Sequence, residues 1–441
     1  MRKNRFGANI LLAVSISYIG YAASFMSSIL VARLLGPEGK GIFSLFIETT
    51  FGIVLFSSLG IGNGQIYEAT RNHKNMKHFM PNAFVFSFTV SIVVALVYYL
   101  TGFYLKLKIV TVLSLSNIVL AIIVIPIMTM IMFQRQFLLA NHNYKLAKAN
   151  YASSMLIPML AYYLIYMQGD LNISNLIISF VSGQFLCFFI FQGLILKFGN
   201  DNGGFSIDLA KKSVRFGIWQ YLSDLCLFLI RRLDFFLVLW MLGKSGLGIY
   251  SVAVSLAEII SRLTHEVGTI LFPVFSSGKI PQGRAAPLLR KIIFIMLMVT
   301  GILALLSRPL ILIIFGKQFS QAIAAFQILL IGTLALSTVD VTWTHAFSLG
   351  KVKLGIPIFG LGAILDLILN LILIPIFGVV GASIASTISY WVAAILFLIH
   401  FCHKEECSIR GALIPTTGDI RTLISGIKEL PKIVFKQHFA G

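Results

Sequence analysis

The sequence carries little charge for its length. Of its 441 residues, 12% are Asp, Glu, Lys or Arg and 58% are hydrophobic, whereas a soluble domain usually has about 25% charged residues. A soluble protein needs a polar surface, and this composition, with a mean hydropathy of +0.91, excludes one. The apolar runs are long enough to cross a bilayer, which takes roughly 20 residues for each helix. The sequence therefore predicts an all-α integral membrane protein.

Acidic residues are especially scarce, with 16 Asp and Glu against 35 Lys and Arg and a net charge of +19. The basic residues lie in short loops between apolar spans, which argues against a nucleic-acid partner. With the N-terminus placed inside, 25 of the 35 basic residues fall on the cytoplasmic side and seven on the outer side. Such an excess marks the cytoplasmic face of a membrane protein. We predict a cytoplasmic (inner) membrane protein with both termini in the cytoplasm.

Several chemical motifs are missing. The segment 243–245 reads Gly-Lys-Ser like the end of a phosphate-binding loop, but Val238 stands where the loop needs its first glycine. Only four cysteines are present, and the two near the last helix end would face a reducing cytosol, so no disulfide is expected. Four side chains near that helix end have a spacing too irregular for a metal site: His400, Cys402, His403 and Cys407. We expect no metal and no cofactor.

Twelve apolar segments are long enough to span the membrane. They lie at residues 9–35, 41–61, 80–103, 109–133, 146–167, 173–198, 214–242, 246–272, 288–306, 320–348, 354–376 and 379–401. Short connections join them, as in a helical bundle. We predict two six-helix lobes, residues 1–198 and 214–402, joined by a cytoplasmic linker, residues 199–213. The basic tail, residues 403–441, is predicted to lie in the cytoplasm, either on the inner membrane surface or free in solvent.

One phrase occurs twice in the chain. Leu34–Ser44 reads LLGPEGKGIFS and Met241–Ser251 reads MLGKSGLGIYS, with six of the eleven positions identical and an offset of 207 residues. In each copy the phrase is a Gly-rich turn between two long apolar segments. Six spans separate the copies, so both turns lie on the outer face. The two lobes are therefore predicted to be parallel repeats about an axis along the membrane normal.

Polar residues gather on two of the spans. In the seventh, Gln220, Asp224, Arg231 and Asp234 fall within about 80° of one another at the helical angle per residue, and Arg232 points away from them. In the eighth span, one face of the helix, roughly 100° wide around the helix axis, carries polar side chains along its whole length. The members of this polar stripe are Ser251, Ser255, Glu258, Arg262, His265, Glu266 and Thr269.

This pattern predicts a hydrated cavity between the lobes. Arg231 and Arg262 would bind an anionic headgroup there, beside Asp224, Asp234 and Gln220. Arginine suits phosphate because its planar donor fork bonds two oxygens and it stays charged. The alternative is that these charges pair only to hold the helices together, Arg231 with one of the aspartates and Arg262 with the nearby glutamate. The sequence leaves both interpretations open.

Ionisable groups within a bilayer often mark ion or proton pathways. The candidates for coupling transport to a proton or cation are Glu258, His265, Asp340 and Glu48, with Asp366 a further carboxylate in the eleventh span. For Glu48 and Asp366, a hydrogen bond between helices is the favoured interpretation.

The sequence resembles the polysaccharide transporter family, the O-antigen or capsule (Wzx-like) flippases, within the multidrug, oligosaccharidyl-lipid and polysaccharide exporter (MOP) superfamily. Three segments carry the resemblance: VARLLGPEGKGIFSL at 31–45, RRLDFFLVLWMLGKSGLGIYSVA at 231–253 and IPIFGVVGASIAS at 374–386. The third segment occurs widely in the superfamily.

The resemblance implies a substrate and a transport cycle. Members of the family move a polyprenyl-diphosphate-linked oligosaccharide from the inner to the outer leaflet, for the synthesis of O-antigen, capsule or exopolysaccharide. Two lobes alternate between inward-open and outward-open states, and the lipid tail stays in the bilayer. The implied partners are the lipid-linked oligosaccharide, membrane lipids, and glycosyltransferases and a polymerase of the same pathway.

Two rival functions share parts of this pattern. A proton- or cation-coupled drug or metabolite antiporter of the same superfamily has the same architecture, but an Arg-rich cavity would repel organic cations. A membrane-bound polysaccharide polymerase or acyltransferase would be an enzyme. Polymerases usually carry a large external loop with catalytic groups, and the longest loops here, 199–213 and 273–287, are predicted to face inward. A transporter is therefore predicted rather than an enzyme.

Overall fold

The computed structural model describes residues 2–169, 172–197, 203–276, 285–416 and 418–419. The described part of the chain is helical and contains no strand. Its α-helices are α1 (Arg2–Ser58), α2 (Ile61–Arg71), α3 (Phe79–Tyr104), α4 (Lys108–Thr111), α5 (Leu115–Ala140), α6 (Tyr144–Gln168), α7 (Ile173–Leu196), α8 (Ile207–Ser276), α9 (Ala285–Ile314), α10 (Ala322–Ser348), α11 (Gly355–Phe377), α12 (Val379–Glu405) and α13 (Ile409–Leu413). Three short 3₁₀ helices connect them: η1 (His73–His78), η2 (Lys317–Phe319) and η3 (Val352–Leu354).

Every predicted span overlaps a helix, although some ends differ by several residues: α8 starts at Ile207 rather than 214, and α9 ends at Ile314 rather than 306. The fourth starts later than predicted, because Ser114 caps α5 by accepting a hydrogen bond from the backbone N–H of Asn117. By length and hydropathy, eight helical segments among the described residues qualify as membrane spans, including the long segment Leu12–Ser58. α6 and α8 are outside this set, and α8 carries the charged side chains of the polar stripe. The prediction of an all-α integral membrane fold is confirmed.

Two helices each contain two of the predicted spans. α1 bends at Gly36 (φ 65°, ψ −170°) and α8 bends at Gly243 (φ 77°, ψ −171°). A positive φ of this size strains a residue that has a Cβ atom, so glycine is the natural occupant. Both bends occupy the same position in the repeated phrase, which explains why the phrase recurs.

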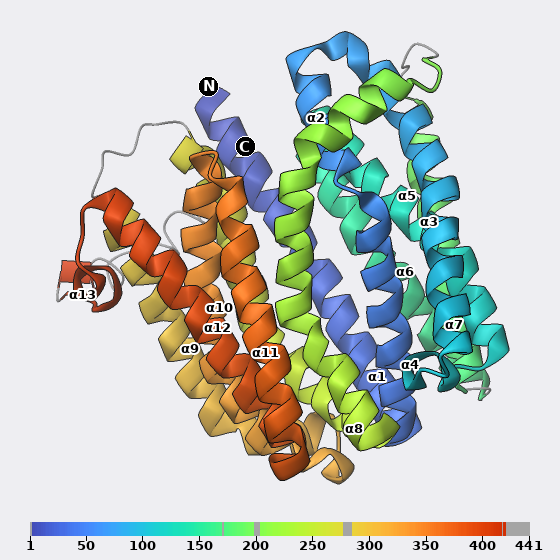
Figure 1. Ribbon diagram of the computed structural model, residues 1–441, viewed down its shortest axis with the longest axis vertical. Coiled ribbons are helices and arrows are strands. Elements are labelled where there is room, and N and C mark those ends of the chain that lie inside the picture. The colour runs from blue at the N-terminus through green and yellow to red at the C-terminus, as the bar shows by residue number, and fades with distance from the viewer. Residues whose placement is uncertain (1, 170–171, 198–202, 277–284, 417, 420–441) are drawn as a thin grey trace, which may run out of the picture.

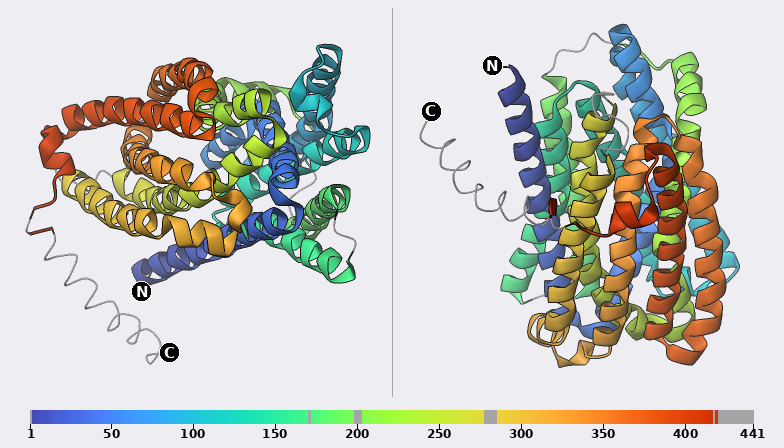
Figure 2. Two further views of the ribbon diagram at one scale, coloured as in Figure 1. Left: turned by 90° about the horizontal axis from the view of Figure 1, so that it is seen from below. Right: turned by 90° about the vertical axis from the view of Figure 1, so that its left-hand side faces the viewer.

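The helices form two groups (Figure 1). α3, α5, α6 and α7 pack around α1 on one side, and α9 to α12 pack around α8 on the other. One hydrophobic cluster lies entirely within residues 61–210 and another within 230–397, while the largest cluster joins both groups where α1 meets α8. α1 and α8 are in extensive contact with each other, and Figure 2 shows the N-terminal part of α1 running along one edge of the molecule. Part of the predicted linker and most of the predicted tail lie outside the described residues.

The end of the molecule with the two bends is tightly closed. A Cβ atom on Gly41 would lie 1.9 Å from the carbonyl oxygen of Lys244, and one on Gly248 would lie 1.8 Å from that of Pro37. The two copies of the phrase therefore touch backbone to backbone, each through its own glycine. Lys244 also forms an ion pair with Glu38 across this contact, at 3.3 Å.

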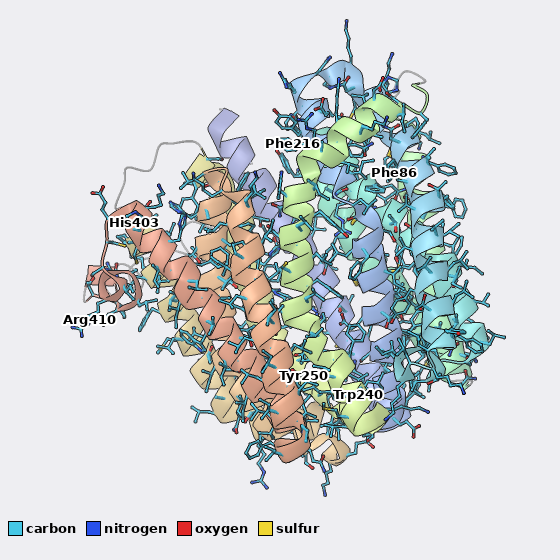
Figure 3. All side chains as sticks on the ribbon, in the orientation of Figure 1. Phe86, Phe216, Trp240, Tyr250, His403 and Arg410 are labelled. Carbon is cyan, nitrogen blue, oxygen red and sulfur yellow. The ribbon has the colours of Figure 1, made fainter. Side chains whose placement is uncertain are left out.

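At the opposite end the groups touch along α2 and the start of α8. The rings of Tyr67 and Phe216 stack at 3.7 Å between centroids, and Gly60 packs against the backbone of Gly217. Figure 3 places Phe216 at this end and Trp240 and Tyr250 toward the other. Between these two contacts the helix groups separate and leave an internal space.

Candidate functional site

A large cavity of about 2420 Å³ lies between the two helix groups. Residues of α1, α2, α5, α6 and α8 line it, together with the segment from the end of α10 through η3 to the start of α11 and His400 of α12. Ten of the lining residues are Lys or Arg and four are Asp or Glu, so the space is strongly cationic. The basic ones are Arg71, Arg135, Lys148, Lys212, Arg215, Arg231, Arg232, Arg262, Lys351 and Lys353. Five of them lie near the end where α2 meets α8: Arg71 ends α2, Lys212 and Arg215 lie near the start of α8, and Lys351 and Lys353 lie at η3.

An ion-pair network centred on Arg232 joins the two helix groups. Arg232 Nε lies 2.7 Å from a carboxylate oxygen of Glu48 in α1, and its Nη2 lies 2.6 Å from Glu258. The second oxygen of Glu258 lies 3.4 Å from Arg262, one turn further along α8. The predicted pairing of Glu258 with Arg262 is present. Arg232, which the helical angles direct away from Arg231 and Asp234, pairs with two carboxylates outside that set and makes the shortest ion pairs in the cavity.

This network separates the large cavity from a smaller pocket of about 390 Å³. Arg232, Glu258 and Arg262 line both spaces. The small pocket extends toward the closed end and is rich in hydroxyl groups. These come from Ser24, Ser27, Ser28, Ser44, Ser154, Ser251, Ser255, Tyr151 and Tyr162. The ammonium of Lys40 donates a hydrogen bond of 2.9 Å to Ser28 there.

Arg231 reaches the large cavity but pairs with a different carboxylate from the one expected. Its Nη2 lies 3.4 Å from Asp340 in α10, and the hydroxyl of Thr264 donates to the other oxygen of Asp340 at 2.8 Å. Asp340 is buried behind Arg231 and fixes its position. The alternative partners considered from the sequence, Asp224 and Asp234, do not form an ion pair with Arg231.

A row of cations and tyrosine rings crosses the cavity wall. The Arg262 guanidinium lies 5.3 Å from the ring centre of Tyr21, which is 5.5 Å from the ring of Tyr151, and Arg135 lies 5.3 Å from Tyr151 on its other side. Cation–π attraction stabilises such contacts. Among the described residues, Arg135 has no carboxylate within ion-pair distance, so it is available to an anionic ligand.

Glu266 ties this row to the opposite helix group. It forms a 3.0 Å ion pair with Lys148 of α6 and accepts a hydrogen bond of 2.9 Å from the hydroxyl of Tyr21. The Glu266 side chain is 1% exposed. Removal of Lys148 would therefore leave a buried carboxylate without its cation.

The remaining predicted residues are divided between cavity and protein interior. Gln220 and Asp224 line the large cavity, with the Gln220 amide donating to Asp224 at 2.8 Å. His265 is exposed in the same cavity, and Glu48 lines the small pocket. Asp234 lines neither space. It is turned into the α8–α12 group, because Tyr250 and Ser386 supply hydrogen bonds there.

Sequence reasoning missed four cavity residues. Arg135 and Lys148 were counted only among the basic residues on the cytoplasmic side, whereas they belong to α5 and α6 and line the cavity. Tyr21 and Tyr151 gave no signal because tyrosine is common near membrane surfaces. Among the described residues, no group of three or more His, Cys, Asp or Glu side chains is placed to hold a metal ion.

Comparison with known proteins places the chain in a family. The model of a family described as polysaccharide biosynthesis protein matches residues 30–324, about two thirds of the chain. The chain belongs to this family. The two repeated turns and the ion-pair residues of α8 all lie inside the matched part.

Two uncharacterized membrane proteins of the archaeon Methanocaldococcus jannaschii are similar to this member of the polysaccharide biosynthesis protein family. One is 25% identical over 280 residues, covering 61% of this chain and 55% of the relative. The other is 26% identical over 250 residues, covering 54% and 59%. The chain thus matches little more than half the length of these curated relatives. Both are membrane proteins, in agreement with a multi-pass protein here.

Solved structures show where the fold belongs. An inward-facing multidrug resistance MATE family transporter of the MOP superfamily superimposes with a TM-score of 0.71 at 13% identity, covering 90% of this chain and 98% of that one. The lipid II flippase MurJ, in an inward closed conformation, gives 0.67 at 14% identity, covering 88% and 87%. This member of the polysaccharide biosynthesis protein family therefore has the MOP transporter fold. Its structural relatives are transporters and flippases rather than enzymes.

Proposed function

We propose that this protein is a flippase that moves a polyprenyl-diphosphate-linked oligosaccharide across the cytoplasmic membrane for surface polysaccharide synthesis. The observation that carries the proposal is the cavity between the helix groups, with ten basic and four acidic lining residues in about 2420 Å³. A space of this size is ample for several sugar rings. Its charge suits a diphosphate, which carries negative charge on several oxygens.

Each part of the substrate has a chemically matched region. Arg135 and Arg262, at the two ends of the tyrosine row, would bind the diphosphate, with Lys148 and Arg231 near by. Sugar rings would pack against the half-buried Tyr21 and Tyr151 and hydrogen-bond to polar side chains such as Gln220. The lipid tail would remain in the bilayer, because moving it through a charged cavity would cost its hydrophobic burial.

The shape corresponds to one state of an alternating-access cycle. Arg71, Lys212 and Lys351 line one end of the cavity, and we assign this end to the cytoplasm because basic loop residues are in excess there. The other end is held closed by the contact of Gly41 with Gly248, and we assign it to the outside. The substrate would enter from the cytoplasmic leaflet. Rocking of the lobes 1–198 and 214–402, with opening of the glycine contact, would then release it outward.

A drug or metabolite antiporter is the second candidate, because a MATE transporter has the same fold. The cavity charge disfavours it. Organic cations would have to enter a space in which basic side chains outnumber acidic ones by ten to four, and like charges repel strongly where water is scarce. We therefore propose the lipid-linked glycan as the substrate.

The decisive experiment depletes the protein and analyses the lipids. The upstream glycosyltransferase is placed under repressible control, because trapped intermediates are toxic. A diphosphate-linked glycan that accumulates on the cytoplasmic leaflet supports the proposal and identifies the sugar. No accumulation, together with greater sensitivity to cationic drugs, supports the antiporter instead.

Variants test the binding residues in the same cells. Arg135→Ala and Arg262→Ala are expected to lower export by tenfold or more, on the order of one lost charge-assisted contact each, while the protein remains in the membrane. Arg262→Lys should recover part of the loss if charge alone matters and little if the planar fork matters. The control is Arg308→Ala, which removes an exposed arginine of α9 that does not line the cavity. Normal export in both alanine variants would remove these two residues from the binding site.

A further inference from the structure

The small pocket contains a buried cation that has no anion of its own. Lys40 of α1 is 5% exposed and lines this pocket. Its ammonium has three N–H donors and uses one of them, in the hydrogen bond to Ser28. Within the described part of the chain it forms no ion pair, because Glu48, which lies in its electrostatic range, is bound by Arg232 at 2.7 Å. A buried charge is costly unless it is paired.

The fold does not require a lysine at this position. Lys40 lies in the first copy of the repeated phrase, and the offset of 207 residues places Leu247 at the same position of the second copy. Leu247 is fully buried, and its copy has the same bend and the same glycine contact as the first. An apolar side chain therefore suits the turn. The ammonium at position 40 must be explained by the pocket that it faces.

The charged residues around the small pocket leave one positive charge over. They are three cations and two carboxylates: Lys40, Arg232, Arg262, Glu48 and Glu258. The two arginines and the two glutamates bind one another in the network that separates the two spaces. Lys40 is therefore the cation that remains, and a single anionic group would complete the pocket.

The rest of the lining suits a sugar ring. A volume of about 390 Å³ lies at the lower end of the range for small-molecule sites, roughly 300–1,000 Å³. The hydroxyls of Ser27 and Ser251 donate to carbonyl oxygens of their own helices, both at 2.8 Å, so their lone pairs are free to accept from the hydroxyl groups of a ligand. The rings of Phe51 and Phe228 supply apolar surface for the C–H face of a sugar.

We propose that the small pocket binds a sugar acid, with the Lys40 ammonium as the partner of its carboxylate. The proposal rests on the flippase function and names the class of its glycan, one that contains a uronic acid or a similar acidic sugar. Tyr151 and Arg262 line both the large cavity and the small pocket. A glycan whose diphosphate is bound in the large cavity therefore has the small pocket beside it, and each of its two kinds of anion has its own cations.

The test measures binding by the purified full-length protein in detergent, without lipid and without transport. Its Tm is followed against increasing concentrations of D-glucuronate, the neutral D-glucuronamide, glucose and acetate, at constant ionic strength and pH. A ligand that binds only the folded state raises the Tm. We expect glucuronate to bind about tenfold or more tightly than glucuronamide or glucose, since these lack the charge-assisted contact. Acetate has the charge without the ring and should give no saturable rise.

A lysine variant and a matched control locate the binding. Lys40→Met should weaken the apparent affinity for glucuronate by about tenfold or more. Its Tm without ligand should be unchanged or higher, because the variant removes a buried cation that has no anion. Lys317→Met, which changes an exposed lysine of η2 that lines neither space, should keep the response to glucuronate.

Three results would overturn the proposal: equal affinities for glucuronate and glucuronamide, equal affinities of Lys40→Met and the parent, or an equal response to acetate, which would indicate a site for any small anion. The comparison of glucuronate with its amide uses the unaltered protein, so it stands even where Lys40→Met fails to fold.

The lipid extract from depleted cells separates this inference from the flippase function. An accumulating glycan that contains an acidic sugar supports both. A neutral glycan that accumulates keeps the flippase and overturns the sugar-acid site. No accumulation, together with glucuronate binding that Lys40→Met abolishes, keeps the site and removes the flippase.

Discussion

The kinked helices α1 and α8 have similar backbone conformations but differ in their charged side chains. With the offset of 207 residues, Gly36 corresponds to Gly243 and Gly41 to Gly248, and each pair has the same conformation or the same contact. The charged residues do not correspond. Arg232 of α8 aligns with Phe25 of α1, and the other residues of the α8 stripe also lack charged counterparts: Glu258 aligns with Phe51 and Arg262 with Leu55.

The comparison separates two functions of the repeat. The bends and the glycine contact recur in both halves, which suits the proposed cycle in which both halves move. The charged residues gather on α8, which suits the single diphosphate group of the proposed substrate. Glu48 of α1 is an exception, and it serves as a partner for Arg232.

The largest effect is expected from removing Arg232, a charged residue of α8 that has no charged counterpart in α1. Arg232→Ala leaves Glu48 and Glu258 facing each other without their shared cation. Loss of one partner of a buried ion pair costs about 3–5 kcal/mol, so we expect a large fall in Tm in detergent. Arg232→Met combined with Glu48→Gln and Glu258→Gln removes all three charges and should recover most of the stability. An unchanged Tm in the single variant would show that water screens the network.

The symmetry is tested at the glycine contact. Gly41→Ala and Gly248→Ala each place a methyl group against a carbonyl oxygen of the other copy, and overpacking of this kind costs about 1–3 kcal/mol. We expect similar effects from both variants and a shift toward the open state at this end. A single cysteine in place of the buried Ser251, in a background without the four native cysteines, should react faster with an impermeant maleimide.

A control for this prediction lies in α9. Gly301 has no atom within 4 Å of an added Cβ, so Gly301→Ala should leave both the Tm and the labelling rate close to those of the parent. Unequal effects of Gly41→Ala and Gly248→Ala would contradict the prediction that both halves contribute equally to the contact at the closed end. They would favour movement of one half alone.

The smallest expected effect concerns a contact with no counterpart in the first half. Asp419 pairs with Arg290 of α9 at 2.6 Å and accepts a hydrogen bond of 2.6 Å from Thr416. Burial opposes ionisation of Asp419, but these partners lower its pKa from 3.8 to about 2. A lowered pKa stabilises the contact above about pH 4, and this contribution is lost as the pH falls toward 2.

Limited proteolysis measures this last contact. Asp419→Asn should make the chain after α13 more sensitive to protease at neutral pH, and the unaltered protein should gain the same sensitivity only on acidification. Thr416→Ala, which removes the two hydrogen bonds of the Thr416 hydroxyl with Asp419 and keeps the ion pair, should have a smaller effect. Equal sensitivity of Asp419→Asn and the parent at neutral pH would show that other contacts hold this segment.

Sequence patterns predicted the parts of this protein that depend on local chemistry. Hydropathy located the membrane helices, and the repeated phrase located both bends, because a positive φ requires glycine wherever it occurs. The i,i+4 spacing predicted the contact of Glu258 with Arg262.

Contacts between distant helices could not be predicted in the same way. Helical angles placed Asp234 beside Arg231, but an angle does not say which neighbouring helix a face meets. Asp234 meets Ser386 of α12, and Arg231 meets Asp340 of α10. Arg232 meets Glu48 from the other half of the chain. Each of these partners lies more than one hundred residues away in the sequence, where periodicity carries no information.

The row formed by Arg262, Tyr21, Tyr151 and Arg135 has a kinetic consequence. Its four groups are spaced at 5 to 6 Å, so a bound ligand can exchange one weak contact for the next without first losing all of them. A pathway must hold its cargo strongly enough for entry and weakly enough for exit. Several weak binding sites, one after another along the row, satisfy both conditions. A single strong binding site would prolong the residence time of the ligand and slow every turnover.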